Sequence, residues 1–241
     1  MKNKLIMDLH THTLASGHAY GTVRENALAA SEKGLKGLGV TEHGPGMPGS
    51  CHPLYFTNIR YIPRELYGVN IYYGVENDMM NDGTMSLQDR FMSQLDYSIV
   101  GIHATCYQDQ GIRKNTENLI KCMSNPKVFF VSHPDDSTYP LDYEEVVPAA
   151  KENNVALEVN NNTIRNGWKK NCIQNIKTYL ELCMRYRTNI IVSSDAHDPS
   201  TVGRFMEAEA LLDEFGFDEY LIINNSEEKF KEFIGFGKTG T

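Results

Sequence analysis

KLIMDLHTHT, at residues 4–13, decides the fold of this chain. Its first six residues form a short, largely apolar run that predicts a buried strand over 4–9, and the run leads directly into His10 and His12. Side chains alternate between the two faces of a strand, so two histidines that are two residues apart point the same way. The segment therefore predicts a strand that delivers a pair of imidazoles at its carboxyl end.

Six more strand-like segments follow along the chain. Each is short, contains β-branched or aromatic residues, and is separated from the next by a helical pattern or a loop. This alternation is typical of βα units, and it predicts an α/β fold with a parallel sheet. The further strands are predicted at 36–41, 70–75, 97–102, 127–132, 155–159 and 189–193, with one more short strand at 220–223. Helices are predicted at 22–33, 116–123, 143–153, 172–185, 201–215 and 227–233, with Pro148 expected to kink or delay the third, and 44–53 is expected to be a long irregular loop.

Composition narrows the class of protein. The 241 residues include 23 Lys and Arg against 31 Asp and Glu, a formal charge of −8. Proteins that bind extended nucleic acid through their overall field usually carry net positive charge, so a long polynucleotide is disfavoured as a partner. The length and the 41% hydrophobic share fit a single domain. Five cysteines without a C-x-x-C pair predict reduced thiols and a cytoplasmic protein, and no stretch approaches the roughly 18 apolar residues of a membrane span.

Metal-ligand residue types stand at the ends of six of the seven main predicted strands. A single histidine at such a position is usually a structural residue. Here, however, seven of the eight histidines lie at or just beyond strand ends, and His18, in the loop after the first strand, is counted among the seven. The carboxyl ends of parallel strands meet on one face of an α/β barrel, so these side chains are expected to converge. The candidate ligands are His10, His12, His18, His43, Glu76, His103, His133, Asp195 and His197, whereas His52 falls outside the pattern.

The chemistry of these nine side chains indicates the metal. Imidazole and carboxylate without thiolate suit Zn²⁺, Mn²⁺ or Fe, and the absence of cysteine ligands argues against a purely structural zinc site. Nine ligands are too many for one tetrahedral ion. Shared among three ions they leave about three ligands per metal, with open positions for hydroxide and substrate as catalytic sites require.

The order of the motifs resembles a known family. DLHTHT at 8–13, TEHG at 41–44, Glu76, GIH at 101–103, SHP at 132–134 and SDAH at 194–197 resemble the PHP (polymerase and histidinol phosphatase) superfamily across nearly the whole chain. The sequence is most similar to the stand-alone bacterial PHP phosphatases with a trinuclear zinc site, because ASGHAYGT at 15–22 also fits them. The resemblance implies one domain over residues 1–241, folded as a distorted TIM-like barrel of seven βα units.

The resemblance also implies a division of the ligands among three ions. It assigns one ion to His10, His12, Glu76 and Asp195, a second to Glu76, His103 and His133, and a third to His18, His43 and His197.

The activity expected from this resemblance is hydrolysis of a small phosphorylated metabolite by a metal-bound hydroxide. Glu76, Asp195 and His197 are the expected catalytic residues. The third ion, or a protonated group such as Asp195 or His197, is expected to stabilise the leaving alkoxide. Arg60 and Arg64, four residues apart, are candidates for holding the phosphate if they share a helix face. The alternatives are a phosphodiesterase or exonuclease on DNA or oligonucleotides, a histidinol-phosphatase, and a non-catalytic metal-stabilised module.

Overall fold

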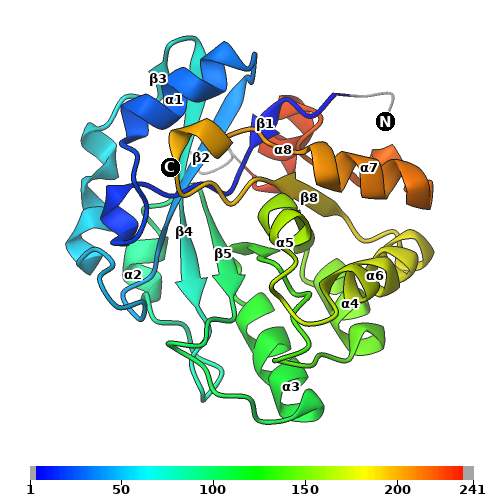
Figure 1. Cartoon of the computed structure of the whole chain (residues 1–241). Helices are drawn as coiled ribbons and strands as arrows, with labels where there is room; N and C mark the ends of the chain where they lie inside the picture. The colour runs from blue at the N-terminus through cyan, green and yellow to red at the C-terminus, as the bar shows by residue number, and fades with distance from the viewer. Residues whose placement is uncertain (1–3, 236–241) are drawn as a thin grey trace.

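A single sheet of seven parallel strands forms the centre of the computed structural model, which describes residues 4–235. The spatial order of the strands follows the chain, so every connection passes outside the sheet to the next position (Figure 1). The strands are β1 (Met7–Asp8), β2 (Gly37–His43), β4 (Val69–Asp78), β5 (Tyr97–Gly101), β6 (Val128–Val131), β7 (Ala156–Asn160) and β8 (Ile190–Ser193). The short β3 (Glu65–Leu66) pairs antiparallel with β4 and was not predicted. The predicted α/β barrel is confirmed.

The barrel closes between β1 and β8 without a regular ladder. At the carboxyl end, the His12 amide donates to the carbonyl of Ala196 at 2.8 Å. At the other end Asn224 fills the gap, because its side-chain Nδ2 donates to the carbonyls of Met7 and Val192 at 2.8 and 2.6 Å. The barrel is therefore distorted, and side-chain hydrogen bonds replace a ladder at this seam: those of Asn224, and those that the Asp8 carboxylate accepts from the amide and hydroxyl of Ser194.

Eight helices surround the strands in the described part of the chain. They are α1 (Val23–Glu32), α2 (Asp89–Met92), α3 (Ile112–Met123), α4 (Tyr143–Glu152), α5 (Asn161–Asn166), α6 (Cys172–Tyr186), α7 (Met206–Phe215) and α8 (Glu227–Phe233). Short 3-10 turns are η1 (Leu14–Ser16), η2 (Pro53–Tyr61), η3 (Pro199–Thr201) and η4 (Glu219–Leu221). The start of α1 follows from its sequence, because Thr22 and Glu25 form a reciprocal capping box.

Several predicted boundaries are wrong. Helix α3 begins at Ile112, four residues before the prediction, and α7 begins at Met206 because η3 and Gly203, with φ +68°, interrupt the predicted helix. Pro148 lies inside α4 without delaying its start, which Asp142 caps. The strand predicted at 220–223 is the turn η4 followed by one bridge from Ile222 to β8.

The barrel interior is apolar at the amino end of the strands and polar at the carboxyl end. Phe230 of α8 is fully buried and closes the amino end, with its ring centroid 4.9 Å from that of Tyr72 and 5.7 Å from that of Tyr97. The polar side chains of the interior lie at the opposite, carboxyl end of the barrel, beside the loops that follow the strands. No helix within residues 4–235 combines the length and apolar character needed to cross a bilayer.

Candidate metal centre

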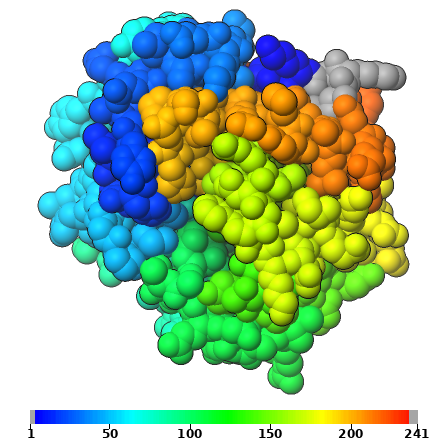
Figure 2. Space-filling view, in the orientation of Figure 1, coloured from blue at the N-terminus to red at the C-terminus, as the bar shows by residue number. Residues whose placement is uncertain are grey.

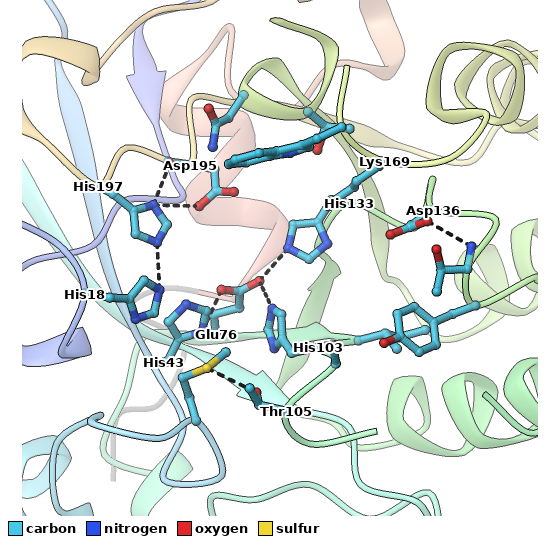
Figure 3. Close-up of a pocket in the computed structure, with 18 of the residues that line it drawn as sticks. His18, His43, Glu76, His103, Thr105, His133, Asp136, Lys169, Asp195 and His197 are labelled. Atoms are coloured by element: carbon cyan, nitrogen blue, oxygen red, sulfur yellow. Dashed lines mark hydrogen bonds and ion pairs between the residues drawn. The ribbon is translucent and has the colours of Figure 1, made fainter. Parts of the chain in front are cut away.

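The nine predicted ligands meet at the carboxyl end of the barrel, where most of them line one cavity of about 770 Å³ (Figure 3). His43 and Glu76 belong to β2 and β4, and His103 and His133 follow β5 and β6 directly. Four of the nine residues (His10, His12, His43 and Glu76) are buried, four are partly buried, and His18 is the most exposed. Residues up to 187 positions apart in the sequence, His10 and His197, thus share one site.

Glu76 lies at the centre of the cluster. Its Oε2 is 3.2 Å from His10 Nε2, 3.4 Å from His12 Nε2 and 3.1 Å from His43 Nδ1. Its Oε1 is 3.2 Å from His103 Nε2 and 3.1 Å from His133 Nε2. One carboxylate therefore faces two separate groups of imidazoles, one with each oxygen.

Asp195 completes the first of these groups. Its Oδ1 lies 3.6 Å from His10 Nε2, 3.3 Å from His12 Nε2 and 3.5 Å from His197 Nδ1. Asp195 and His133 both have positive φ, +50° and +30°, although neither is glycine. Such backbone strain is concentrated at functional sites, where the surrounding structure holds it in place.

The third group consists of His18, His43 and His197. The Nε2 atoms of His18 and His197 are 3.2 Å apart, and the His18 ring stacks on the His43 ring with 4.9 Å between centroids. Three triplets place their ligand atoms within 4.8 Å of one another: His12, His43 and His197; His10, His12 and Glu76; and His43, Glu76 and His103. His18, His133 and Asp195 are outside these triplets.

A second layer of side chains orients the imidazoles. The Nδ1 atoms of His10, His12 and His103 donate to Glu158 at 2.6 Å, Ser16 at 3.0 Å and Asp78 at 2.9 Å. With the proton on Nδ1, the lone pair of Nε2 points into the cluster, which is the arrangement that metal-binding histidines need.

Sequence reasoning missed Glu158 and Asp78. Glu158 is a carboxylate inside a largely apolar strand, whereas Asp78 is the last residue of β4, two positions after Glu76 and so on the same face of the strand. Both signals were available in the sequence.

Burial and charge set the protonation of the ring nitrogens. Burial lowers the pKa of His12 to about 3 and that of His43 to about 2, so both imidazoles are neutral near pH 7. Burial acts in the same direction on His103, but the charge of Glu76 and the hydrogen bond to Asp78 outweigh it and raise the pKa to about 9.

The donor set fits divalent cations. Glu76 Oε2 and His43 Nδ1 are buried and have no hydrogen-bond partner within residues 4–235, although they lie 3.1 Å apart. A buried carboxylate oxygen without a hydrogen bond is costly unless a cation compensates it. Neutral imidazoles and carboxylates are also the ligand types that zinc and related ions take.

Arg60 and Arg64 do not reach this site, so the expectation that they hold phosphate is corrected. Arg64 pairs with Asp96, which stands immediately before β5 and so at the amino end of the barrel. The guanidinium of exposed Arg60 lies over the neighbouring Tyr61 ring, 5.0 Å from its centroid. Neither arginine lines the cavity.

Most of the exposed surface of the cavity wall is apolar, although its residues beyond the ligand set include several threonines, Asn162 and three charged side chains. Tyr20 and Trp168 stand at its edge with 77% and 72% of their surface exposed, and Met47, Ile102 and Tyr139 lie further in. In the space-filling view, the blue N-terminal segment and the yellow-green segment near residue 165 occupy the same face of the molecule (Figure 2). The site is therefore a polar cluster at the base of a mostly apolar pocket.

This fold and this cluster define an α/β-barrel protein with a metal centre at its strand ends. The family model described as PHP domain matches residues 8–235. A probable phosphatase of Clostridium novyi (strain NT) is 41% identical over 235 residues, covering 96% of this chain and 95% of the relative. A probable phosphatase of Caldanaerobacter subterraneus subsp. tengcongensis is 40% identical, covering 97% and 92%.

A solved structure supports the fold independently. The crystal structure of histidinol phosphate phosphatase from Lactococcus lactis, complexed with zinc, L-histidinol and phosphate, superimposes with a TM-score of 0.63 at 19% identity. The match covers 89% of this chain and 95% of that one. The chain belongs to the PHP domain family, and it is a hydrolase of the phosphatase class.

Proposed function

We propose that this protein is a phosphomonoesterase that hydrolyses a small phosphorylated metabolite and uses three divalent metal ions. Zinc is the metal that suits the ligands best. Mn²⁺ and Fe are the alternatives, because they accept the same imidazole and carboxylate ligands. One observation carries the proposal: Glu76 is buried, and its two oxygens face five imidazole nitrogens within 3.4 Å. Five free thiols, all within the described residues, support a cytoplasmic location.

The ligands divide into three sets in this proposal. The first is His10, His12, Glu76 and Asp195; the second is Glu76, His103 and His133; the third is His18, His43 and His197. Glu76 belongs to two sets because each of its oxygens faces a different group of rings. Divalent ions bound here supply positive charge for the phosphoryl oxygens and lower the pKa of a coordinated water.

The chain's own residues orient these ligands. Glu158 and Asp78 hold a proton on Nδ1 of His10 and His103, and nearby carboxylates raise the pKa of both rings, so an ion that binds there would displace the proton from Nε2. Asp195 and His197 lie on the open side of the cluster, with 13% and 28% of their side chains exposed. We assign to this side of the cluster the stabilisation of the leaving oxygen.

Metal analysis combined with turnover of p-nitrophenyl phosphate tests the proposal. The purified protein is expected to contain metal, to lose turnover on complete chelation and to regain it when Zn²⁺ or Mn²⁺ is returned. Circular dichroism of the chelated protein controls for unfolding. Turnover that survives complete metal removal would overturn the mechanism.

The rival activities need different substrates. The cavity wall holds a single lysine and no arginine among the described residues, which supports a small substrate over a polynucleotide strand. Faster hydrolysis of bis(p-nitrophenyl) phosphate or an oligonucleotide than of p-nitrophenyl phosphate or a mononucleotide would favour the diesterase. Histidinol phosphate is assayed alongside, and a metal-loaded protein that hydrolyses none of these would favour the non-catalytic module.

A further inference from the structure

One cation stands in the cavity wall outside the metal cluster. Lys169 lies in the connection between α5 and α6, and of the described lining residues it is the one lysine or arginine. Beyond the ligand set, the wall carries two carboxylates, Asp136 and Asp198, which repel an anionic substrate. A phosphomonoester is a dianion near neutral pH, so the position of the one ammonium group matters for its recognition.

The Lys169 ammonium is buried and its hydrogen bonds are not filled. Its side chain is 19% exposed, and Nζ is buried with no hydrogen-bond partner within residues 4–235. The nearest carboxylate oxygen belongs to Asp135, at 3.8 Å, which is too far for a hydrogen bond. An ammonium has three donors, and a buried charge that leaves them empty is unfavourable unless a ligand or water supplies acceptors.

The backbone fixes Lys169 beside a predicted metal ligand. The Ser137 amide donates to the carbonyl of Lys170 at 2.9 Å, and Asn175 Nδ2 donates to the carbonyl of Asp135 at 2.7 Å. These bonds tie the Lys169 connection to the loop that follows β6 and carries His133. Lys169 and His133 also line the same small cavity beside the main one, and Figure 3 places Lys169 on the side of the site where His133 and Asp136 lie.

We propose that Lys169 Nζ binds a phosphoryl oxygen of the substrate, and of the phosphate product, at the edge of the metal cluster. The inference rests on the proposed function and replaces the two arginines that the sequence suggested. Lysine binds phosphate as a compact point charge, and a charge-assisted hydrogen bond to phosphate is stronger than one between neutral groups. The competing explanation is that Lys169 only neutralises the buried Asp135.

Inorganic phosphate is the probe that separates these explanations. Calorimetry measures its dissociation constant on the metal-loaded wild type and on Lys169→Met, which keeps the length of the side chain and removes the charge. The matched control is Lys170→Met, the exposed neighbouring lysine. The double variant Lys169→Met with Asp135→Asn removes the unpaired carboxylate that the single variant leaves behind.

We expect phosphate to bind about ten-fold or more weakly to Lys169→Met, since a hydrogen bond between charged groups is lost. The KM for p-nitrophenyl phosphate is expected to rise in parallel, the double variant to remain as weak as the single one, and Lys170→Met to match the wild type. Trp168 is the only tryptophan in the chain and lines the same cavity, so its fluorescence gives a local reading of the same titration.

Three results would overturn the inference: no phosphate binding by the wild type, unchanged binding by Lys169→Met, or recovery of wild-type affinity in the double variant. The last result would make Lys169 a structural counterion. Failure of the proposed function is distinguishable, because it would leave phosphate binding dependent on Lys169 while no phosphomonoester is hydrolysed.

Discussion

Glu158→Gln tests whether the second layer holds the metal cluster together. The Glu158 carboxylate is fully buried in β7 and accepts four hydrogen bonds. Oε1 accepts from His10 Nδ1 at 2.6 Å and from the Ser193 hydroxyl, and Oε2 accepts from the His133 amide at 2.7 Å and from Asn160 Nδ2 at 3.0 Å. Burial favours the protonated form, but the charge of His10 outweighs this, so the pKa of Glu158 is lowered and the group is ionised.

The magnitude follows from the number of donors. Glutamine offers one acceptor oxygen, so in either orientation its amino group faces two of the four donors. Two buried donors without acceptors cost about 1–3 kcal/mol each, which gives a loss of about 2–6 kcal/mol in the free energy of unfolding. Loss of the partner that orients His10 is expected to weaken metal binding by about 10–100-fold.

Urea unfolding and chelator competition measure these two effects. Unfolding is followed for the metal-free protein, so that the stability loss is separated from the metal. Glu152→Gln is the matched control, because Glu152 is exposed at the end of α4. If Glu158→Gln unfolds within about 0.5 kcal/mol of the wild type and binds metal equally well, the orienting role of Glu158 is refuted.

Three other substitutions probe separate parts of the molecule. His103→Ala is expected to lower kcat for p-nitrophenyl phosphate by about 100-fold or more while changing the urea midpoint of unfolding little. A loss of activity that is matched by an equal loss of folding stability would indicate a structural role for His103. Glu207→Gln removes a carboxylate whose pKa the Arg204 hydrogen bond lowers to about 2. This stabilisation is present above the unfolded pKa of about 4.5 and is lost as pH falls toward the folded pKa of about 2. The variant is expected to unfold about 0.5–1 kcal/mol more easily at pH 7, and this difference is expected to fall to less than half at pH 3. An undiminished difference at pH 3 would contradict this reasoning. Asn224→Ala is expected to lower the free energy of unfolding by about 2–5 kcal/mol. The control Asn225→Ala, which loses one hydrogen bond, is expected to lower it by about 1 kcal/mol. Equal urea midpoints for the two variants would show that the β1–β8 seam does not depend on Asn224.

The convergence of the candidate ligands could be predicted because it depends on a local pattern and one topological rule. His10, His43, Glu76 and His133 each lie within two residues of the carboxyl end of a strand, and parallel strands of a barrel place those ends together. The same rule could have excluded Arg64, which stands shortly before β4 and so at the opposite end of the barrel. The mistake was to infer a shared helix face from a four-residue spacing without asking which end of the barrel the segment occupies.

Other features depend on contacts that no local pattern records. Asn224 forms hydrogen bonds that connect β1 and β8, although it lies 217 residues after Met7 in the sequence. The residues next to Asn224 in the sequence do not indicate these hydrogen bonds. The contact between Lys169 and the loop after β6 likewise depends on how two connections pack. The late start of α7 does have a local signal, because Pro199 begins the turn η3 and Gly203 follows it.

Anomalous diffraction from crystals of the metal-loaded protein tests the central claim most directly. We expect three peaks at the carboxyl end of the barrel, two of them adjacent to opposite oxygens of Glu76 and the third among His18, His43 and His197. Data collected across the absorption edges of zinc, iron and manganese would identify the element. A cluster without metal peaks, or metal bound only elsewhere on the molecule, would contradict the account.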